Sequence, residues 1–90
     1  MIYETRGDLD KAEEMHLKSL AIEENLGRQE GMASDYGNLG MVYKERGDTQ
    51  KARQYWQKAL EIFKKVGMKP EIEQTQENLD ELEGQNQEGQ

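Results

Sequence analysis

Residues 36–66 read YGNLGMVYKERGDTQKARQYWQKALEIFKKV, and this stretch decides the fold. Apolar and small residues recur at helical spacing up to Tyr43, and the same spacing resumes from Ala52 onward. The pair Gly47-Asp48 separates the two periodic segments. This pattern predicts a helix, a tight turn and a second helix, a unit that favours a binding scaffold over an enzyme.

The same unit recurs along the chain at an offset of 40 residues. Arg6-Gly7-Asp8 falls on Arg46-Gly47-Asp48, and Asn38-Leu39 falls on Asn78-Leu79. A fixed period of this size predicts a stacked array of helices. The expected fold class is therefore all-α, with antiparallel helix-turn-helix repeats.

The period also predicts the domain organisation. Residues 1–83 are expected to form a single domain. Within it, residues 1–27 are a partial repeat that lacks most of its first helix, residues 28–67 are a complete repeat, and residues 68–83 are a capping helix. Residues 84–90, GQNQEGQ, have no apolar side chain to bury and are expected to be a flexible tail.

Glycines mark the expected ends of the helices, and aspartates mark two of the starts. Glycine can adopt the left-handed conformation that ends a helix, and an aspartate just after it can cap the next helix. The helix-ending residues are predicted to be Gly7, Gly27, Gly47 and Gly67, and the capping residues Asp8 and Asp48. Pro70 suits the first turn of the last helix, which is expected to end near Glu83.

Two further glycines fall inside a predicted helix. Gly37 and Gly40 each cost about 1 kcal/mol of helix propensity relative to alanine. Their presence predicts that another helix approaches closely there, with Ala52 on the facing side of the same seam.

The last predicted helix has an apolar stripe on one side and polar residues on another. Its apolar stripe is expected to face the preceding helix and consists of Ile72, Leu79 and Leu82. Polar residues occupy the positions equivalent to Tyr36, Gly40 and Tyr43, namely Gln76, Asp80 and Glu83. This change is typical of a cap rather than of a helix that begins another repeat.

Composition limits the kind of domain and its surroundings. The 90 residues are 33% hydrophobic and 34% charged, which predicts a small domain with a thin core. The chain has no cysteine, which excludes disulfides and thiolate metal sites. No apolar run approaches a membrane span and the first residues have no signal-peptide core, so the default expectation is a soluble cytoplasmic protein without membrane contact.

The charge distribution is uneven. The net charge of −7 argues against a nucleic-acid partner, which needs a basic surface. Residues 1–40 carry a net −5, residues 41–66 a net +4 and residues 67–90 a net −6. Two interpretations stay open: solvated helix faces, or electrostatic complementarity with a second molecule.

Chemical motifs are few. Arg-Gly-Asp occurs at residues 6–8 and 46–48, and is interpreted as a helix-ending glycine and a capping aspartate rather than as an integrin motif. His16, the one histidine, stands where the next repeat has Trp56 and is expected in a helix–helix seam. No nucleophile–base pair, phosphate-binding loop or metal-ligand spacing is present, so no enzyme activity, catalytic residue, cofactor or metal is predicted.

With these residues the chain resembles the tetratricopeptide repeat family. The family's small and aromatic positions are matched by Tyr36, Leu39, Gly40, Tyr43, Gly47, Ala52, Trp56 and Ala59. The usual period of the family is about 34 residues. The period of 40 residues in this chain resembles the longer variety found in kinesin light chains and in cell-polarity scaffolds.

The resemblance implies a short right-handed α-solenoid whose concave groove holds a peptide or segment of a protein partner. The first helix of each pair lines that groove, and an asparagine there commonly clamps the peptide backbone. Asn38 and Asn78 occupy this position, and Ser34, Met41 and Glu45 are expected beside Asn38 on the concave face.

The chain departs from the relatives of this family that hold a peptide's terminal carboxylate. Gln74 and Asn78 stand where those proteins carry lysine and arginine, so a carboxylate clamp is not expected.

The alternative function is a structural unit that associates with copies of itself through the open first repeat. Leu9 and Ala12 leave apolar surface there, whereas His16, Ser19 and Glu23 make part of the seam polar. A homodimer is the commonest closed assembly for such a surface.

Overall fold

A computed structural model describes residues 2–88 of the chain, with the side chains of residues 7–84. The four helices are α1 (Ile2–Leu26), α2 (Gln29–Arg46), α3 (Thr49–Val66) and α4 (Lys69–Glu88). No strand occurs between residues 2 and 88. The all-α prediction is confirmed.

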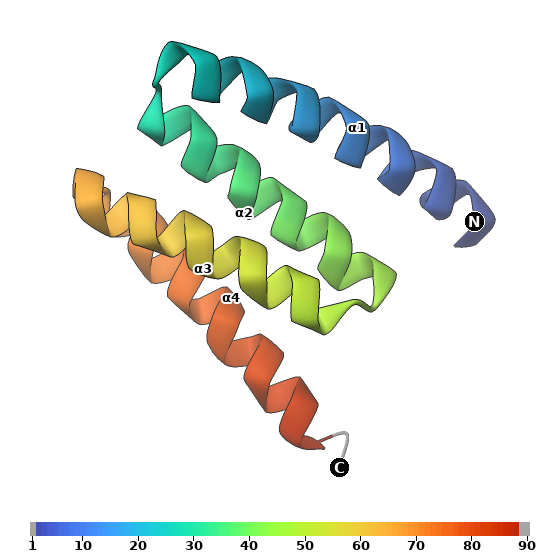
Figure 1. Ribbon diagram of the computed structural model, residues 1–90. Coiled ribbons are helices and arrows are strands. Elements are labelled where there is room, and N and C mark those ends of the chain that lie inside the picture. The colour runs from blue at the N-terminus through green and yellow to red at the C-terminus, as the bar shows by residue number, and fades with distance from the viewer. Residues whose placement is uncertain (1, 89–90) are drawn as a thin grey trace.

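Successive helices run antiparallel and stack in the order of the sequence (Figure 1). Each helix packs against the next one, so α2 and α3 lie inside the stack while α1 and α4 lie at its two ends. The stack measures 38 × 28 × 18 Å along its principal axes. This is the short helical solenoid that the repeated pattern predicts.

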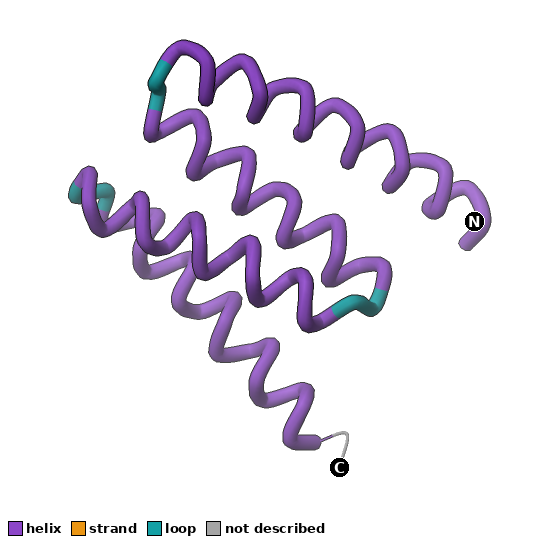
Figure 2. The backbone as a smooth tube through the Cα atoms, viewed as in Figure 1, coloured by secondary structure: helices purple, strands orange, loops and turns teal. Residues whose placement is uncertain are grey.

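Three short turns join the helices (Figure 2). Each contains a glycine with a positive φ: 71° at Gly27, 86° at Gly47 and 83° at Gly67. Asp48 caps α3, because its Oδ1 accepts a hydrogen bond of 3.1 Å from the backbone N–H of Lys51. These helix ends are confirmed as predicted.

The predicted helix break at Gly7-Asp8 is wrong. α1 runs without interruption from Ile2 to Leu26, and Gly7 has no positive φ. Continuing the helix keeps the backbone hydrogen bonds, at a cost of about 1 kcal/mol for a glycine in a helix interior.

The predicted end of the last helix near Glu83 is also wrong. α4 begins at Lys69, with Pro70 in its first turn as predicted, and continues to Glu88. Residues 84–88, expected as part of a flexible tail, are therefore helical, and residues 89–90 lie outside the described residues. Glutamine and glutamate are good helix formers, so the helix continues beyond its last buried side chain.

The core lies between α2, α3 and α4 and forms two clusters. The first consists of Tyr43, Ala52, Trp56, Leu79 and Leu82, and the second of Ala33, Ala59 and Phe63 with Ile72 packed against it. The apolar residues predicted for α4 thus face α3. The polar positions of α4 are exposed: Gln76, Asp80 and Glu83.

The seam between α2 and α3 is closed by Trp56, which is 1% exposed. Its indole lies directly against Gly40, so the predicted close approach is confirmed at this glycine. At Gly37 the prediction is wrong in its detail, because a Cβ atom there would meet no atom within 4 Å. Gly37 contributes its carbonyl oxygen instead, which accepts a hydrogen bond of 3.0 Å from Trp56 Nε1.

The seam between α1 and α2 is largely polar. The Tyr43 hydroxyl donates to Glu13, and Arg46 donates to the same carboxylate at 2.7 Å and also to Asp10. The hydrogen bond from Tyr43, followed by the charge and hydrogen bond of Arg46, holds the pKa of Glu13 below its ordinary value despite some desolvation. The same bond, with burial, raises the pKa of Tyr43 to about 12.

Further along α1 the contact with α2 is a mixture of polar and apolar groups. Ser19 Oγ donates a hydrogen bond of 2.9 Å to the buried carboxylate of Asp35. Leu20 is buried beside it, and His16 is half-buried, consistent with its predicted place in a seam. α1 is therefore positioned mainly by hydrogen bonds and ion pairs, while the core holds the other three helices.

Candidate functional site

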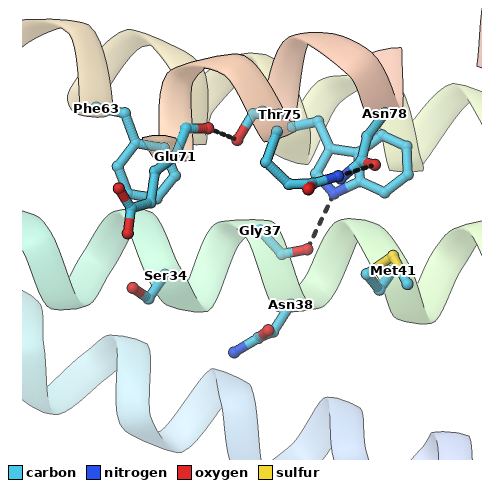
Figure 3. Close-up of a pocket in the computed structure, with 10 residues that line it drawn as sticks. Ser34, Gly37, Asn38, Met41, Phe63, Glu71, Thr75 and Asn78 are labelled. Atoms are coloured by element: carbon cyan, nitrogen blue, oxygen red, sulfur yellow. Dashed lines mark hydrogen bonds between the residues drawn. The ribbon is translucent and has the colours of Figure 1, made fainter. Parts of the chain in front are cut away.

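A cavity of about 240 Å³ lies between α2 and α4, with α3 behind it (Figure 3). Three groups of side chains line it. α2 contributes Ser34, Gly37, Asn38 and Met41, α3 contributes Trp56 and Phe63, and α4 contributes Glu71, Gln74, Thr75 and Asn78. We refer to this cavity and its rim as the α2–α4 groove.

The groove exists because α2 and α4 pack on the same side of α3 without filling the space between them. Trp56 and Phe63 are core residues of α3 and form the apolar floor. The hydrogen bond from Trp56 to the Gly37 carbonyl ties this floor to the α2 wall. A rigid apolar floor between two polar walls is a common form for a binding site.

The α2 wall presents side chains that are open to solvent. Ser34, Asn38 and Met41 are all exposed and lie along one edge of the helix. Among the described side chains, none is hydrogen-bonded to the Asn38 amide, which Figure 3 shows directed away from α4. Asn38 therefore has its donors and its acceptor available for a ligand.

Side chains of the α4 wall, unlike those of the α2 wall, are hydrogen-bonded to one another or to the helix backbone. Thr75 is buried, and its hydroxyl donates a hydrogen bond of 2.7 Å to the backbone carbonyl of Glu71. Gln74 Nε2 donates to Asn78 Oδ1 at 3.2 Å, which leaves the amide N–H groups of Asn78 available. This wall can thus offer donors at fixed positions.

Four of the five residues predicted for the concave face line the groove: Ser34, Asn38, Met41 and Asn78. The fifth, Glu45, is exposed one helical turn beyond Met41 and does not line the cavity. Asn38 and Asn78 lie on facing walls, although their amides do not point at one another.

Sequence reasoning did not assign Glu71, Gln74 and Thr75 to the groove of this chain, although Gln74 stands where relatives carry a residue that binds a carboxylate. The offset of 40 residues contains the signal for one of them, because Gln74 is the equivalent of Ser34 as Asn78 is of Asn38. Glu71 lies three residues before Gln74, and residues three apart share a helix face. Extending the predicted stripe by one turn on the last helix would have found it.

The described residues form neither a cluster of metal ligands nor a helix that could span a membrane. Within the part of the chain that the structure describes, no three His, Asp or Glu side chains come together as metal ligands. None of the described helices is both long and apolar enough to cross a membrane.

Antiparallel helix pairs at a fixed repeat, with a groove walled by the first helix of each pair, define a helical-repeat scaffold. A family model described as tetratricopeptide repeat matches residues 1–65. The chain therefore belongs to the tetratricopeptide repeat family, as its sequence indicates. The 40-residue variety stays a prediction.

Repeats of this family are typically non-catalytic scaffolds, and membership places the chain in the class of protein–protein interaction modules. Its expected partners are accordingly proteins. A search among curated proteins and one among solved structures gave no match.

Proposed function

We propose that the chain binds an extended segment of a protein partner in the α2–α4 groove. The observation that carries this proposal is the Asn38 side chain, which is exposed on the α2 wall of the cavity and free of hydrogen bonds to other described side chains. A primary amide offers both a donor and an acceptor, which match the C=O and N–H groups of a peptide backbone.

The residues around Asn38 are also suited to binding an extended peptide. Trp56 and Phe63 would lie beneath an apolar side chain of the ligand, and the Asn78 amide would add donors from the opposite wall. Met41 is 44% exposed at the rim, where its flexible side chain can adapt to different ligand side chains. Glu45 would contact a ligand that extends beyond the cavity along α2.

The test uses peptides selected from a random display library against the folded chain. Asn38→Ala should weaken a selected peptide by about 0.5–1.5 kcal/mol for each lost backbone hydrogen bond, without changing the thermal melt. Asn25→Ala is the matched control, because Asn25 is an exposed asparagine on α1, outside the groove. Equal effects of the two variants, or a ligand whose NMR shifts are confined to α1, would refute the groove.

A second candidate function is self-association, favoured by an exposed apolar stripe on α1. Met15, Ile22 and Leu26 are 68%, 59% and 58% exposed. The first two are equivalent, at the offset of 40 residues, to Tyr55 and Ile62. In α3 those residues pack against α2: Tyr55 stacks between two tyrosines of α2, and Ile62 packs against the second core cluster.

A second copy of the chain would cover this stripe and form a homodimer. Light scattering over a series of protein concentrations at low salt tests the assembly. The double variant Met15→Gln, Ile22→Gln should then remain monomeric, while Leu17→Gln, which changes an exposed apolar residue of α1 outside the stripe, should still associate. A monomeric mass of the unchanged chain at high concentration would exclude this candidate.

A further inference from the structure

We propose that the segment bound in the α2–α4 groove is positively charged and places a lysine or arginine side chain beside Glu71. This inference rests on the groove function proposed above and specifies the chemistry of the partner. Among the described residues that line the cavity, Glu71 is the one that carries a charge.

The position of Glu71 suits it to receive a cation. Glu71 is half-buried. Figure 3 shows its carboxylate directed from α4 toward α2, on the Ser34 side of the groove. Its backbone carbonyl is held by the Thr75 hydroxyl, which fixes this turn of α4. No lysine or arginine among the described side chains forms an ion pair with it. A carboxylate partly removed from water gains most from a charge-assisted hydrogen bond.

Carboxylates also stand at both ends of the groove. Glu30 and Glu45 lie one helical turn beyond the two ends of the α2 wall, and Glu81 continues the α4 wall by three residues. All three are exposed. The charged residues of the described lining and of these three rim positions are therefore all carboxylates, a distribution that attracts cationic ligands and repels acidic ones.

Three basic residues of the neighbouring helices are held elsewhere. Arg46 forms ion pairs with Glu13 and Asp10 in the α1–α2 seam. Lys51 and Lys58 lie over tyrosine rings of α2, with Nζ 5.1 Å and 5.4 Å from the ring centroids. No lysine or arginine is among the described residues that line the cavity, so the basic residues of the middle of the chain do not line the groove.

The spacing of the acidic residues predicts the spacing of charge in the ligand. Glu71 and Glu81 are ten residues apart on α4, which is about 15 Å along a helix axis. An extended peptide covers about 3.3 Å per residue. Two basic residues about four or five positions apart would therefore reach both carboxylates at once.

The test is a selection of random peptides of about 12 residues, long enough to span the groove when extended. Peptides selected against the unchanged chain are expected to be enriched in lysine and arginine, with pairs at the spacing given above. Glu71→Gln should weaken these peptides about three- to fivefold, the range of a partly exposed ion pair. Binding should also weaken as salt rises from about 0.05 to 0.5 M.

Glu77→Gln is the matched control, because it removes the same charge from α4 outside the groove, where Glu77 lines a separate shallow cavity with Ile72 and Asp80. It should leave the binding unchanged. If Glu77→Gln weakens the peptides as much as Glu71→Gln, the effect is one of net charge and the assignment to Glu71 is overturned.

The selected peptides also separate this inference from the function on which it rests. Peptides that lose affinity in Asn38→Ala but are acidic or uncharged would overturn the charge inference and leave the groove function standing. Peptides that are indifferent to both Asn38→Ala and Glu71→Gln would overturn both, because they do not bind in the groove.

Discussion

The indole of Trp56 occupies the space that any side chain at Gly40 would need. A Cβ atom at Gly40 would lie 2.8 Å from Cε2 of the ring and closer still to Nε1 and Cδ1. The ring cannot move away freely, because it is 1% exposed and Nε1 is hydrogen-bonded to the Gly37 carbonyl. Gly40 thus determines how closely α3 packs on α2, and with it the depth of the groove floor.

The first prediction follows from this contact. Gly40→Ala should lower the free energy of unfolding by about 1–3 kcal/mol, the usual cost of forcing extra volume into a packed seam. Urea unfolding, followed by the fluorescence of Trp56, measures the change.

Gly37→Ala is the control for that experiment, because its new methyl group would enter open space. This variant should be neutral or gain up to about 1 kcal/mol from the better helix propensity of alanine. If both variants lose the same stability, the cause is a property of the helix rather than the contact with Trp56.

The second prediction concerns the attachment of α4 to the rest of the molecule. Leu82 is 1% exposed and belongs to the core cluster around Trp56. Leu82→Ala should cost about 2–5 kcal/mol, the range for truncating a fully buried leucine. Because α4 lies at the end of the stack and packs mainly against α3, its amides should also exchange hydrogen faster in this variant than in the unchanged chain. Leu17→Ala, at an exposed leucine of α1, is the control, and a melt of Leu82→Ala that matches this control would contradict the packing.

The third prediction is a loss of the α1–α2 contact in acid. The folded-state pKa of Glu13 lies below its ordinary value of 4.5, mainly because Tyr43 donates a hydrogen bond to the ionised carboxylate. A lowered pKa means that this contribution to stability is complete above about pH 4.5 and is lost as the pH falls through the lowered value. Hydrogen exchange of the α1 amides over this pH range measures the loss.

Two variants show whether protonation of Glu13 causes the loss of the α1–α2 contact in acid. Glu13→Gln should make the α1 amides exchange hydrogen faster at neutral pH. It should also remove the part of the pH dependence of this exchange that comes from protonation of Glu13. Glu14→Gln changes the adjacent, more exposed carboxylate, which makes only a 4.0 Å contact with Lys18, and should behave as the unchanged chain. Identical acid profiles for the unchanged chain and Glu13→Gln would mean that other carboxylates control the transition.

The sequence predicted the helices wherever local signals and packing agree. From α2 to the start of α4, the glycine stops, the Asp48 cap and the apolar stripes all correspond to observed contacts. The two errors in helix bounds lie at Gly7 and beyond Glu83, where the helix continues past a local stop signal. A glycine permits a turn, but the burial of apolar surface beyond it decides whether the turn forms.

The groove could be predicted in part, for a similar reason. Ser34 and Asn38 lie on one helix face, which the spacing alone reveals. The spacing on the last helix places Glu71 on the same stripe as Gln74. Its place opposite α2 depends on how α2 and α4 are aligned across α3, which is a property of packing between helices that are distant in sequence. Only the folded arrangement shows that the Asn78 amide accepts a hydrogen bond from Gln74, whereas no described side chain is hydrogen-bonded to the Asn38 amide.

The last prediction uses the two copies of Arg-Gly-Asp, which have the same sequence and different structures. Asp48 caps α3 through its hydrogen bond to the Lys51 N–H, whereas Asp8, its equivalent, lies inside α1. Asp48→Ala should therefore lower the free energy of unfolding by about 1 kcal/mol, the typical value for the loss of an N-cap. Asp8→Ala removes no cap and places a better helix former within a helix, so it should be neutral or slightly stabilising. Chemical unfolding of the two variants measures the difference, and a loss in Asp8→Ala equal to that in Asp48→Ala would show that the chain turns at Gly7 after all.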